Sequence, residues 1–311
     1  MTDRSTEARH PDALGLHRLA APDAAGLLLT AQQGALEALR SALPAIEQVA
    51  QAGVAALQGG GRMGYAGAGS SGLMALADCL EMAGTFGLPP DRTPMLFAGG
   101  ADALLHMRGA VEDDPALARA DVTRAGLGPG DLLLVLSASG TTPYALEAMR
   151  AAQAQGTRVA GFANVAGSPL LALADITVLI DTGAEMIAGS TRMGAGTAQK
   201  VALNMVSVLV GIGLGHVHDG HMVNLVADNA KLRGRAARIV ADIAGTGLDA
   251  ADAALEQAGG AVKPAILIAR GATPEGALAA LQASDGHLGP ALAQDFHQTR
   301  PVRGPITGRR P

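Results

Sequence analysis

Residues 67–72 read GAGSSG and carry glycines at the spacing of a dinucleotide-binding loop. In such a loop the glycines form a tight turn, and an acidic residue at the end of the next strand binds the ribose. The next apolar run, PMLFAGG, ends without an acid. Ser70 and Ser71 instead put two hydroxyls just ahead of a predicted helix, whose free N–H groups favour an anion. The loop therefore indicates a single phosphate group rather than a dinucleotide.

A second loop, SASGTTP, repeats this chemistry between an apolar run and a helix whose start is marked by Pro143. Its hydroxyl side chains are Ser137, Ser139, Thr141 and Thr142. Parallel sheets bind ligands beyond the carboxyl ends of their strands, which is where both loops are predicted. Either loop alone is equally well explained by serines and threonines that cap helices. Two such loops favour a site for a phosphate and a sugar.

The elements that must position these loops follow from an alternation of short apolar runs and amphipathic helices. The runs include RMGYAG, TPMLFAG, DLLLVLSAS, RVAGFAN and ITVLID. Strands joined in this way form a parallel sheet with helices on both faces. The sequence predicts a three-layer α/β sandwich with about five parallel strands. Residues 201–215 read as a long buried helix, because polar and glycine residues interrupt their apolar run.

Helical segments flank the predicted sheet. A polar arm to about residue 20 precedes two helices over residues 23–58, where apolar side chains recur at helical spacing. Another helix is predicted over residues 221–243, and short helices with Gly- and Pro-marked turns follow. We expect three parts: the arm and helices at 1–58, a ligand-binding α/β domain at 59–243 and a small helical domain at 244–311.

Composition narrows the function classes. The 311 residues carry a net charge of −5, with 2% aromatic residues and no tryptophan, so the basic patches and stacking platforms of nucleic-acid binders are not expected. The apolar stretches fall short of the ~20 residues of a membrane span, and the first residues lack the apolar region of a secretory signal. Cys79, the single cysteine, has no partner for an internal disulfide. The sequence predicts a cytoplasmic protein that binds neither nucleic acid nor membrane.

Three motifs carry a resemblance to a known family. GAGSSG followed nine residues later by Glu81, then SASGTTPY, and above all GAEMIAGSTRMGAGTAQKVALNM at 183–205, resemble the SIS (sugar isomerase) domain of the N-acetylmuramic acid 6-phosphate etherases. The glucokinase regulatory protein is a more distant relative. The similarity runs from TEAR at 6–9 through VNLVADNAKL at 223–232, and S-x-R-M-x-A-G-T-A-Q-K is its most specific part.

The resemblance implies a dimeric lyase that acts on N-acetylmuramic acid 6-phosphate. Such an enzyme releases D-lactate and leaves N-acetylglucosamine 6-phosphate by elimination followed by hydration. It needs no metal or organic cofactor. In this family pattern the partners are a phosphorylated amino sugar and a second copy of the chain, which contributes part of the site.

Two carboxylates carry the chemistry that the resemblance implies. A base must remove the proton at C2, an acid must protonate the departing ether oxygen at C3, and water then adds. Matched by position, these residues are Glu81 and Glu112. We expect Glu81 to be the acid and later the activator of water and Glu112 to be the base, with the reverse order left open. The alternative for each is an exposed or helix-capping glutamate.

The substrate contacts that the resemblance implies are hydroxyls. They are Ser71, Ser137, Ser139 and Thr142, joined by Ser190 and Thr191 of the GSTRM loop, with Ser70 at a position where threonine is usual. Glu185 is either a further acid near the site or a cap of the next element. Lys200 and Arg192 either supply positive charge to the phosphate or are solvated or packing residues.

Several positions depart from the etherase pattern. Leu73, Thr141 and Gly194 stand where basic residues are usual, and Gly109 stands in place of a glutamate. The lactyl carboxylate of a muramic acid needs a positively charged partner. The departures leave open both that partner and the identity of the sugar.

Two other functions use the same loops. A sugar-phosphate sensor would bind a ligand without breaking a bond, and an aldose–ketose isomerase would use one of the glutamates to move a proton between C1 and C2. The presence of both Glu81 and Glu112 favours the lyase.

A histidine-rich segment, GHVHDGHMVN at 215–224, has near metal-ligand density through His216, His218 and His221, with Asp219 between them. Strand alternation would put only His216 and His218 on one face. We interpret the segment as a polar turn between helices, without a metal.

Overall fold

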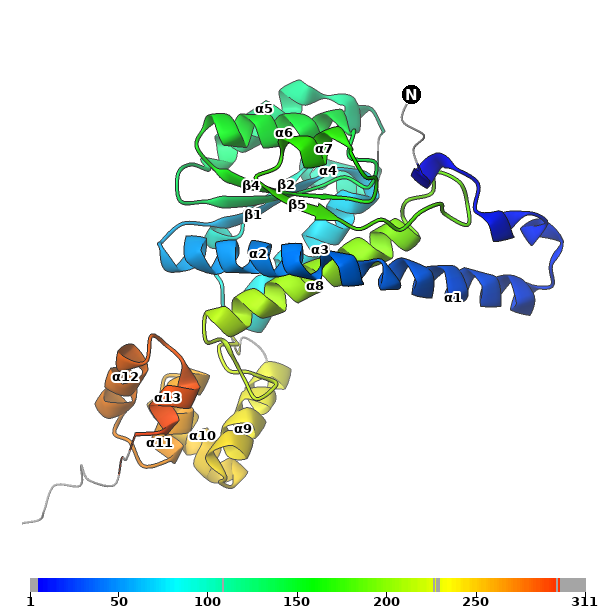
Figure 1. The fold of residues 1–311 in the computed structure, drawn as a ribbon. Coiled ribbons are helices and arrows are strands. Elements are labelled where there is room, and N and C mark those ends of the chain that lie inside the picture. The colour runs from blue at the N-terminus through cyan, green and yellow to red at the C-terminus, as the bar shows by residue number, and fades with distance from the viewer. Residues whose placement is uncertain (1–4, 108, 226, 228–229, 295, 297–311) are drawn as a thin grey trace, which may run out of the picture. The chain divides into compact units, whose positions relative to one another are not determined.

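The computed structural model describes residues 5–107, 109–225, 227, 230–294 and 296 (Figure 1). The chain divides into two compact units. One consists of Met1–Ala83 and Leu88–Gly213, and the other of Gly84–Gly87 and Leu214–Pro311. The second unit begins in the main at Leu214, earlier in the chain than the predicted domain boundary between residues 243 and 244. The predicted domain boundary stays a prediction. Each unit is described by itself below.

The first unit is built on a five-stranded parallel sheet, as predicted. Its strands are β1 (Met63–Gly67), β2 (Met95–Phe97), β3 (Leu132–Leu136), β4 (Arg158–Ala163) and β5 (Ile176–Leu179), in the order β2-β1-β3-β4-β5. In the centre, Gly67 of β1 lies opposite Leu136 of β3. Both of these strands are buried along their whole length, as expected for apolar runs between two layers of helices. The loops that follow β1 and β3 therefore lie side by side.

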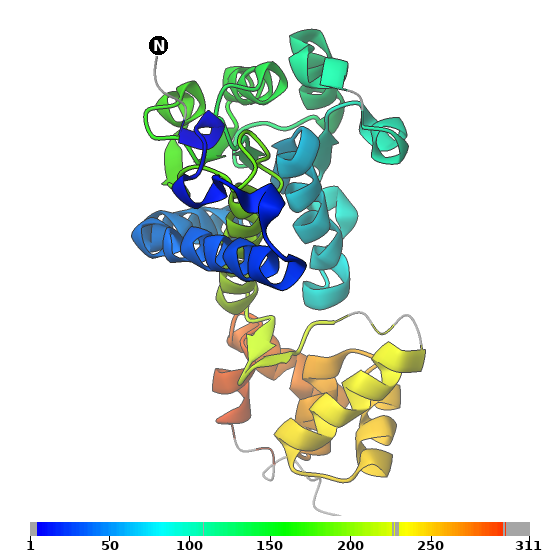
Figure 2. The same cartoon turned by 90° about the vertical axis from the view of Figure 1, so that its right-hand side faces the viewer.

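Helices cover both faces of the sheet and make the three-layer sandwich (Figures 1 and 2). One face carries α5 (Pro115–Ala125), α6 (Pro143–Ala154) and α7 (Pro169–Leu173), with α4 (Gly100–Leu105) beside β2. The other face carries α2 (Leu39–Gln58), α3 (Gly69–Phe86) and α8 (Gly194–Gly213). Buried Tyr144, Ala148 and Met149 of α6 pack on Leu133 and Val135 of the sheet. The fold prediction is confirmed.

The two helices predicted over residues 23–58 are present, whereas α8 is longer than its apolar run indicated, so the expectation that no apolar stretch reaches the length of a membrane span is wrong for this helix. Helix α1 (Ala21–Glu37) precedes α2, and Ala35 is its one fully buried residue. Among the described helices, α8 is the one long and apolar enough to cross a membrane, and 56% of its most apolar window is buried inside the chain. Its buried residues include Ala198, Ala202 and Val206, at the spacing of a helix face that packs on a core.

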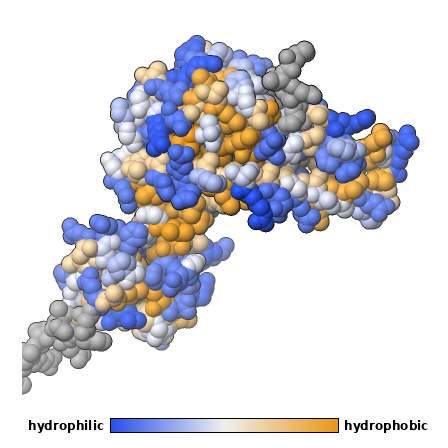
Figure 3. Space-filling model, in the orientation of Figure 1, coloured by the Kyte–Doolittle hydropathy of each residue, from blue (hydrophilic) through white to orange (hydrophobic). Residues whose placement is uncertain are grey.

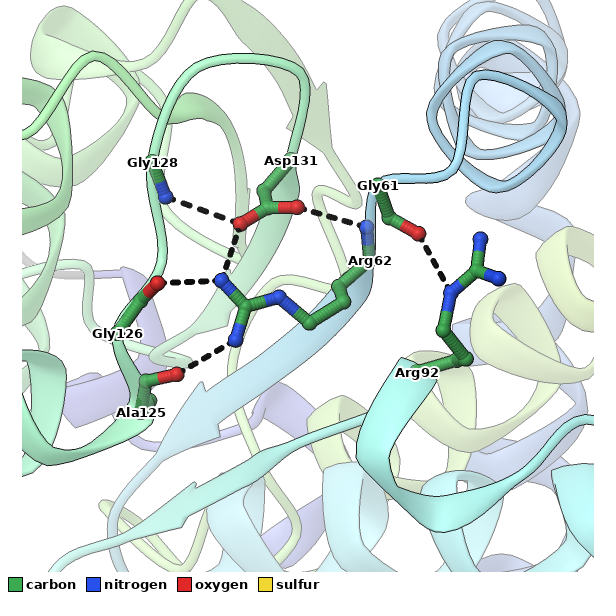
Figure 4. A network of polar contacts seen from close by, with 7 residues as sticks. All are labelled: Gly61, Arg62, Arg92, Ala125, Gly126, Gly128 and Asp131. Carbon is green, nitrogen blue, oxygen red and sulfur yellow. Dashed lines mark hydrogen bonds and ion pairs between the residues drawn. The ribbon is translucent and has the colours of Figure 1, made fainter.

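At the amino ends of β1 and β3 the strands are tied by a polar network (Figure 4). Asp131 Oδ1 accepts the backbone N–H of Arg62 at 2.7 Å, and Oδ2 accepts the Arg62 guanidinium at 2.7 Å and the N–H of Gly128 at 2.9 Å. The guanidinium also donates to the carbonyls of Ala125 and Gly126. This end of the sheet is opposite to the GAGSSG and SASGTTP loops, which are called the hydroxyl loops below. The network therefore stabilises the fold and does not contribute to a site at those loops.

We expect Asp131→Asn to lower the free energy of unfolding by roughly 2 kcal/mol, because the half-buried Arg62 guanidinium loses the charge of its buried partner. Denaturant unfolding followed by circular dichroism measures the change. Asp91→Asn, at an exposed aspartate, is the control with a near-zero effect. Equal unfolding midpoints for the two variants would contradict the assigned role of Asp131.

The second unit has its own hydrophobic core under five helices. They are α9 (Ala230–Ala244), α10 (Leu248–Gln257), α11 (Val262–Ala269), α12 (Pro274–Ala283) and α13 (Leu288–Leu292). Buried Val240, Ile266, Leu267, Ala277 and Leu288 pack together in this core.

The predicted helix over residues 221–243 is wrong at its start. His221 lies in β7 (His221–Met222), which pairs with β6 (Val217–His218) in a hairpin. Asp219 and Gly220 form the turn with φ of 44° and 78°, as in the Asp-Gly turns that suit two-residue hairpins.

Two of the three histidines, His218 and His221, pair with different aspartates. His218 lies 3.7 Å from Asp219, while His221 lies 2.7 Å from Asp242. Within the described ranges, no group of three His, Cys, Asp or Glu side chains is arranged to hold a metal ion.

Candidate active site

The two hydroxyl loops meet at the carboxyl ends of β1 and β3. Ser71, in the first turn of α3, is 7% exposed. Its Oγ accepts the backbone N–H of Ala138 at 3.2 Å, which lies between Ser137 and Ser139 of the second loop. Because Ser71 is the acceptor in this bond, its own proton remains available to an anion.

The side chains of the second loop bond to one another. Ser137 Oγ lies 2.8 Å from Thr142 Oγ1, and Ser139 Oγ lies 3.0 Å from Thr141 Oγ1. The N–H of Gly140 donates to Ser137 Oγ at 3.1 Å. Thr142 is the N-cap residue of α6, yet its side chain makes no capping hydrogen bond. These hydroxyls are thus grouped with each other, which favours a ligand site over simple helix capping.

Glycines let the first loop pass close to its neighbours. A Cβ at Gly72 would lie 2.8 Å from the carbonyl carbon of Gly67, so β1 and α3 touch backbone to backbone. Gly69 has a φ of +54°, and a Cβ there would lie 2.7 Å from Glu112 Oε1. The Glu112 carboxylate therefore lies directly over the first loop.

Glu112 belongs to a short 3-10 helix, Gly109–Asp113, and is half-buried. Burial, followed by the charge of Asp113, raises the pKa of the Glu112 carboxyl above its ordinary value. A carboxylate with a raised pKa is a stronger base. Position and basicity together suit Glu112 to remove a proton from a ligand held at the loops.

Glu81 does not come near the loops of its own chain. It is exposed on α3, twelve positions after Gly69, which corresponds to about 18 Å along a helix axis. That distance exceeds the length of an extended phosphorylated hexose. Its neighbour Leu80 is 68% exposed.

Ser190 and Thr191 lie half-buried in the loop between β5 and α8. The N-terminal arm packs on this loop, since the N–H of Gly189 donates to the carbonyl of Thr6 at 3.0 Å and a Cβ at Gly189 would lie 2.9 Å from Glu7 Oε2. In the described part of the chain, no hydrogen bond joins the side chain of Ser190 or Thr191 to either hydroxyl loop. Ser70 is half-buried at the start of α3.

Glu185 caps α8, which was one of its two predicted roles. Its carboxylate is buried and accepts the N–H groups of Gly194 and Ala195 at 2.9 and 2.8 Å. Two bonds to the first turn satisfy N–H groups that have no partner within the helix.

Glu185→Ala is expected to reduce the free energy of unfolding by about 2 kcal/mol, because two buried N–H groups lose their acceptor. Glu185→Gln keeps one carbonyl oxygen and should recover part of the loss. Urea titration of the three proteins tests this order, and an alanine variant as stable as the wild type would contradict it.

A polar cluster that the sequence analysis missed lies between α3 and α8. Asp78, 2% exposed, accepts Tyr65 Oη at 3.1 Å on Oδ2, and Asn204 Nδ2 at 3.0 Å and Ser207 Oγ at 3.1 Å on Oδ1. Lys200 Nζ lies 3.9 Å from Oδ1. Burial raises the pKa of Asp78, against the effect of Lys200 and these hydrogen bonds. The sequence did contain one sign of this cluster, because Asp78 is a single acidic residue on the apolar side of α3.

Comparisons with known proteins agree with this architecture. A family model described as a SIS domain matches residues 30–164. The chain is 43% identical over 296 residues to the N-acetylmuramic acid 6-phosphate etherase of Deinococcus radiodurans, covering 94% of this chain and 97% of that protein. It is 40% identical over 263 residues to the protein of the same name from Pectobacterium atrosepticum, covering 85% and 87%.

Among solved structures, a phosphoheptose isomerase from Francisella tularensis is similar at 23% identity with a TM-score of 0.46, covering 63% of this chain and 98% of that one. The match to the Deinococcus radiodurans protein extends over nearly the full length of both sequences. The chain belongs to the N-acetylmuramic acid 6-phosphate etherase family.

Proposed function

We propose that this protein is a carbon–oxygen lyase that cleaves the lactyl ether of N-acetylmuramic acid 6-phosphate. The observation that carries the proposal is the 43% identity to an etherase over 94% of the chain. The grouping of hydroxyls with a basic carboxylate at one end of the sheet supports it independently.

The phosphate is proposed to bind where the two hydroxyl loops meet. Its proposed ligands are Ser70, Ser71, Ser137, Ser139, Thr141 and Thr142, together with the free N–H groups at the start of α3. The positive end of the α3 dipole favours an anion at this position. Ser190 and Thr191 are proposed to contact the sugar.

Glu112 is proposed to be the base. It removes the proton at C2 of the open-chain sugar, and the electron pair of that C–H bond forms a C2=C3 double bond as the C3–O bond breaks. The ether oxygen takes a proton from an acid and leaves as lactate. Water then adds at C3, and the proton returns to C2, which gives N-acetylglucosamine 6-phosphate.

Glu81 of a second subunit is proposed to be the acid, so the active enzyme is proposed to be a dimer.

Three features support the proposed dimer. Glu81 is separated from the hydroxyl loops of its own chain by about 18 Å, it is exposed beside Leu80, and α1, α2 and α8 carry an apolar surface. The exposed apolar residues of that surface are Leu29, Leu43, Val208, Leu209 and Ile212, and Figure 3 shows hydrophobic residues gathered along α1 and α8. A groove of about 470 Å³ runs between α2 and α8. A second copy would cover this surface.

A cytoplasmic location is proposed as well. It fits Cys79, which is buried and free, because reducing compartments keep thiols unpaired.

The deciding experiment measures D-lactate released from N-acetylmuramic acid 6-phosphate by the purified full-length chain. Stoichiometric lactate and N-acetylglucosamine 6-phosphate are expected. If a folded protein binds the substrate and releases no lactate, the etherase is ruled out. Conversion of an aldose phosphate to a ketose phosphate without lactate would instead identify an isomerase.

A further inference from the structure

Lys200 is placed by the Asp78 cluster and not by the hydroxyl loops. The Asp78 carboxylate is buried at the contact of α3 with α8 and is fixed by hydrogen bonds from Tyr65, Asn204 and Ser207. Its negative charge holds the Lys200 ammonium at 3.9 Å. The contact is therefore an ion pair between a buried acid and a half-exposed base.

The N–H donors of the Lys200 ammonium are available to a ligand. A separation of 3.9 Å is beyond hydrogen-bond distance, and Asp78 already accepts three bonds from uncharged donors. In the described part of the chain, Lys200 donates no hydrogen bond to a protein atom. With 32% of its side chain exposed, Lys200 is accessible to an anion from outside.

The acid that holds Lys200 is near Glu81 along α3. Asp78 and Glu81 are three positions apart on α3, and side chains at that spacing are neighbours on one helix surface, with about 5–6 Å between Cβ atoms. Asp78, which holds Lys200, is therefore a neighbour of Glu81 on the surface of α3. In a dimer Lys200 and Glu81 would enter the partner's site together, since both come from the same subunit.

We propose that Lys200, positioned by Asp78, binds the lactyl carboxylate of the substrate and sets the preference of the enzyme for muramic acid. This inference rests on the proposed function. In the lactyl ether one carbon separates the carboxylate from the ether oxygen, so the acid at that oxygen and the partner of the carboxylate must be neighbours. Basic residues are usual at the positions of Leu73, Thr141 and Gly194, and this chain lacks them. Lys200 supplies the positive charge that the lactyl carboxylate then requires.

The test compares two substrates, N-acetylmuramic acid 6-phosphate and its analogue in which the lactyl carboxylate is a carboxamide. Formation of N-acetylglucosamine 6-phosphate is measured for both. We expect Lys200→Met to lower kcat/KM about 30-fold or more on the carboxylate substrate, the value of a hydrogen bond to a charged group. The same variant should leave kcat/KM on the carboxamide nearly unchanged.

Further variants separate recognition from folding. Lys200→Arg keeps the positive charge and should retain most of the preference for the carboxylate. Asp78→Asn should lose part of it, because Lys200 is no longer held. Lys231→Met, at an exposed lysine of α9, is the matched control and should behave as the wild type. Thermal midpoints confirm that each variant is folded.

Equal losses on the two substrates in Lys200→Met would overturn the inference while leaving the etherase intact. The inference would also be overturned if Lys200→Met preferred the carboxylate substrate over the carboxamide, in kcat/KM, as strongly as the wild type does. A wild type that cleaves neither substrate would overturn the proposed function, and the inference with it.

Discussion

Glu81→Gln and Glu112→Gln are each expected to release lactate at no more than about one hundredth of the wild-type rate, while an equimolar mixture recovers about a quarter of the wild-type rate. Loss of a general acid or base typically costs two to four orders of magnitude. The recovery follows from the proposed site, which pairs Glu112 of one subunit with Glu81 of the other.

The expected quarter is a matter of dimer statistics. Random pairing puts about half of the dimers in the mixed form. In a mixed dimer, the subunit carrying Glu81→Gln supplies an intact Glu112, and its partner supplies an intact Glu81. One of the two sites is therefore complete, and the other lacks both carboxylates.

The measurement uses co-expressed subunits with different affinity tags, so that mixed dimers can be isolated and should show about half of the wild-type activity. Each variant paired with itself is the control. Mixed dimers without activity would contradict a site shared between subunits and would place both glutamates in one chain. The position of Glu81 on α3 argues against that outcome.

Lys263→Met is expected to stabilise the second unit by about 2 kcal/mol at pH 7. Lys263 is 7% exposed, and its Nζ donates to the carbonyl of Gly286 at 2.8 Å. Within the described residues it has no carboxylate partner. Burial lowers the pKa of its ammonium to about 8, which corresponds to about 3 kcal/mol of cost for the charged form. Loss of one hydrogen bond offsets about 1 kcal/mol of the gain.

The pH dependence has a definite sign. The folded pKa of Lys263 is below its ordinary value of 10.5, so its contribution to stability is complete above pH 10.5 and is lost as the pH falls to about 8. Burial, with Lys263 and His287, lowers the pKa of His216 from 6.5 to about 4. Stability from His216 is therefore lost between pH 6.5 and 4.

Calorimetry on the full chain from pH 4 to 10.5 tests both statements. The difference in stability between Lys263→Met and wild type should be largest below pH 8 and shrink as the pH rises to 10.5. Lys231→Met is again the matched control. A difference that is constant over this range would show that the gain comes from packing rather than from the buried charge.

The fold could be predicted because local signals and tertiary packing agree. The strands β1 and β3 are apolar runs buried between two layers of helices, and Pro143 starts α6 as its position indicates. The loop hydroxyls follow from these boundaries, and the structure brings the first two loops together through Ser71 and Ala138.

Contacts between distant segments could not be predicted in this way. The approach of Glu112 to Gly69 depends on the path of the 42 intervening residues, and no periodic pattern encodes it. Asp78 looked like one acid in an apolar helix because its partners, Asn204 and Ser207, come from α8. The hairpin at Asp219 and Gly220 did have a signal, an Asp-Gly pair, but apolar spacing farther along made the whole segment look helical.

The backbone contact between β1 and α3 limits how this site can diverge during evolution. Because any side chain at Gly67 or Gly72 would collide with the other residue's main chain, no single substitution there can widen the loop or change its charge. Under the proposed function, new ligand preferences must arise away from this backbone contact, at the residues around Lys200. Descendants of this protein would therefore keep the phosphate and exchange the rest of the ligand.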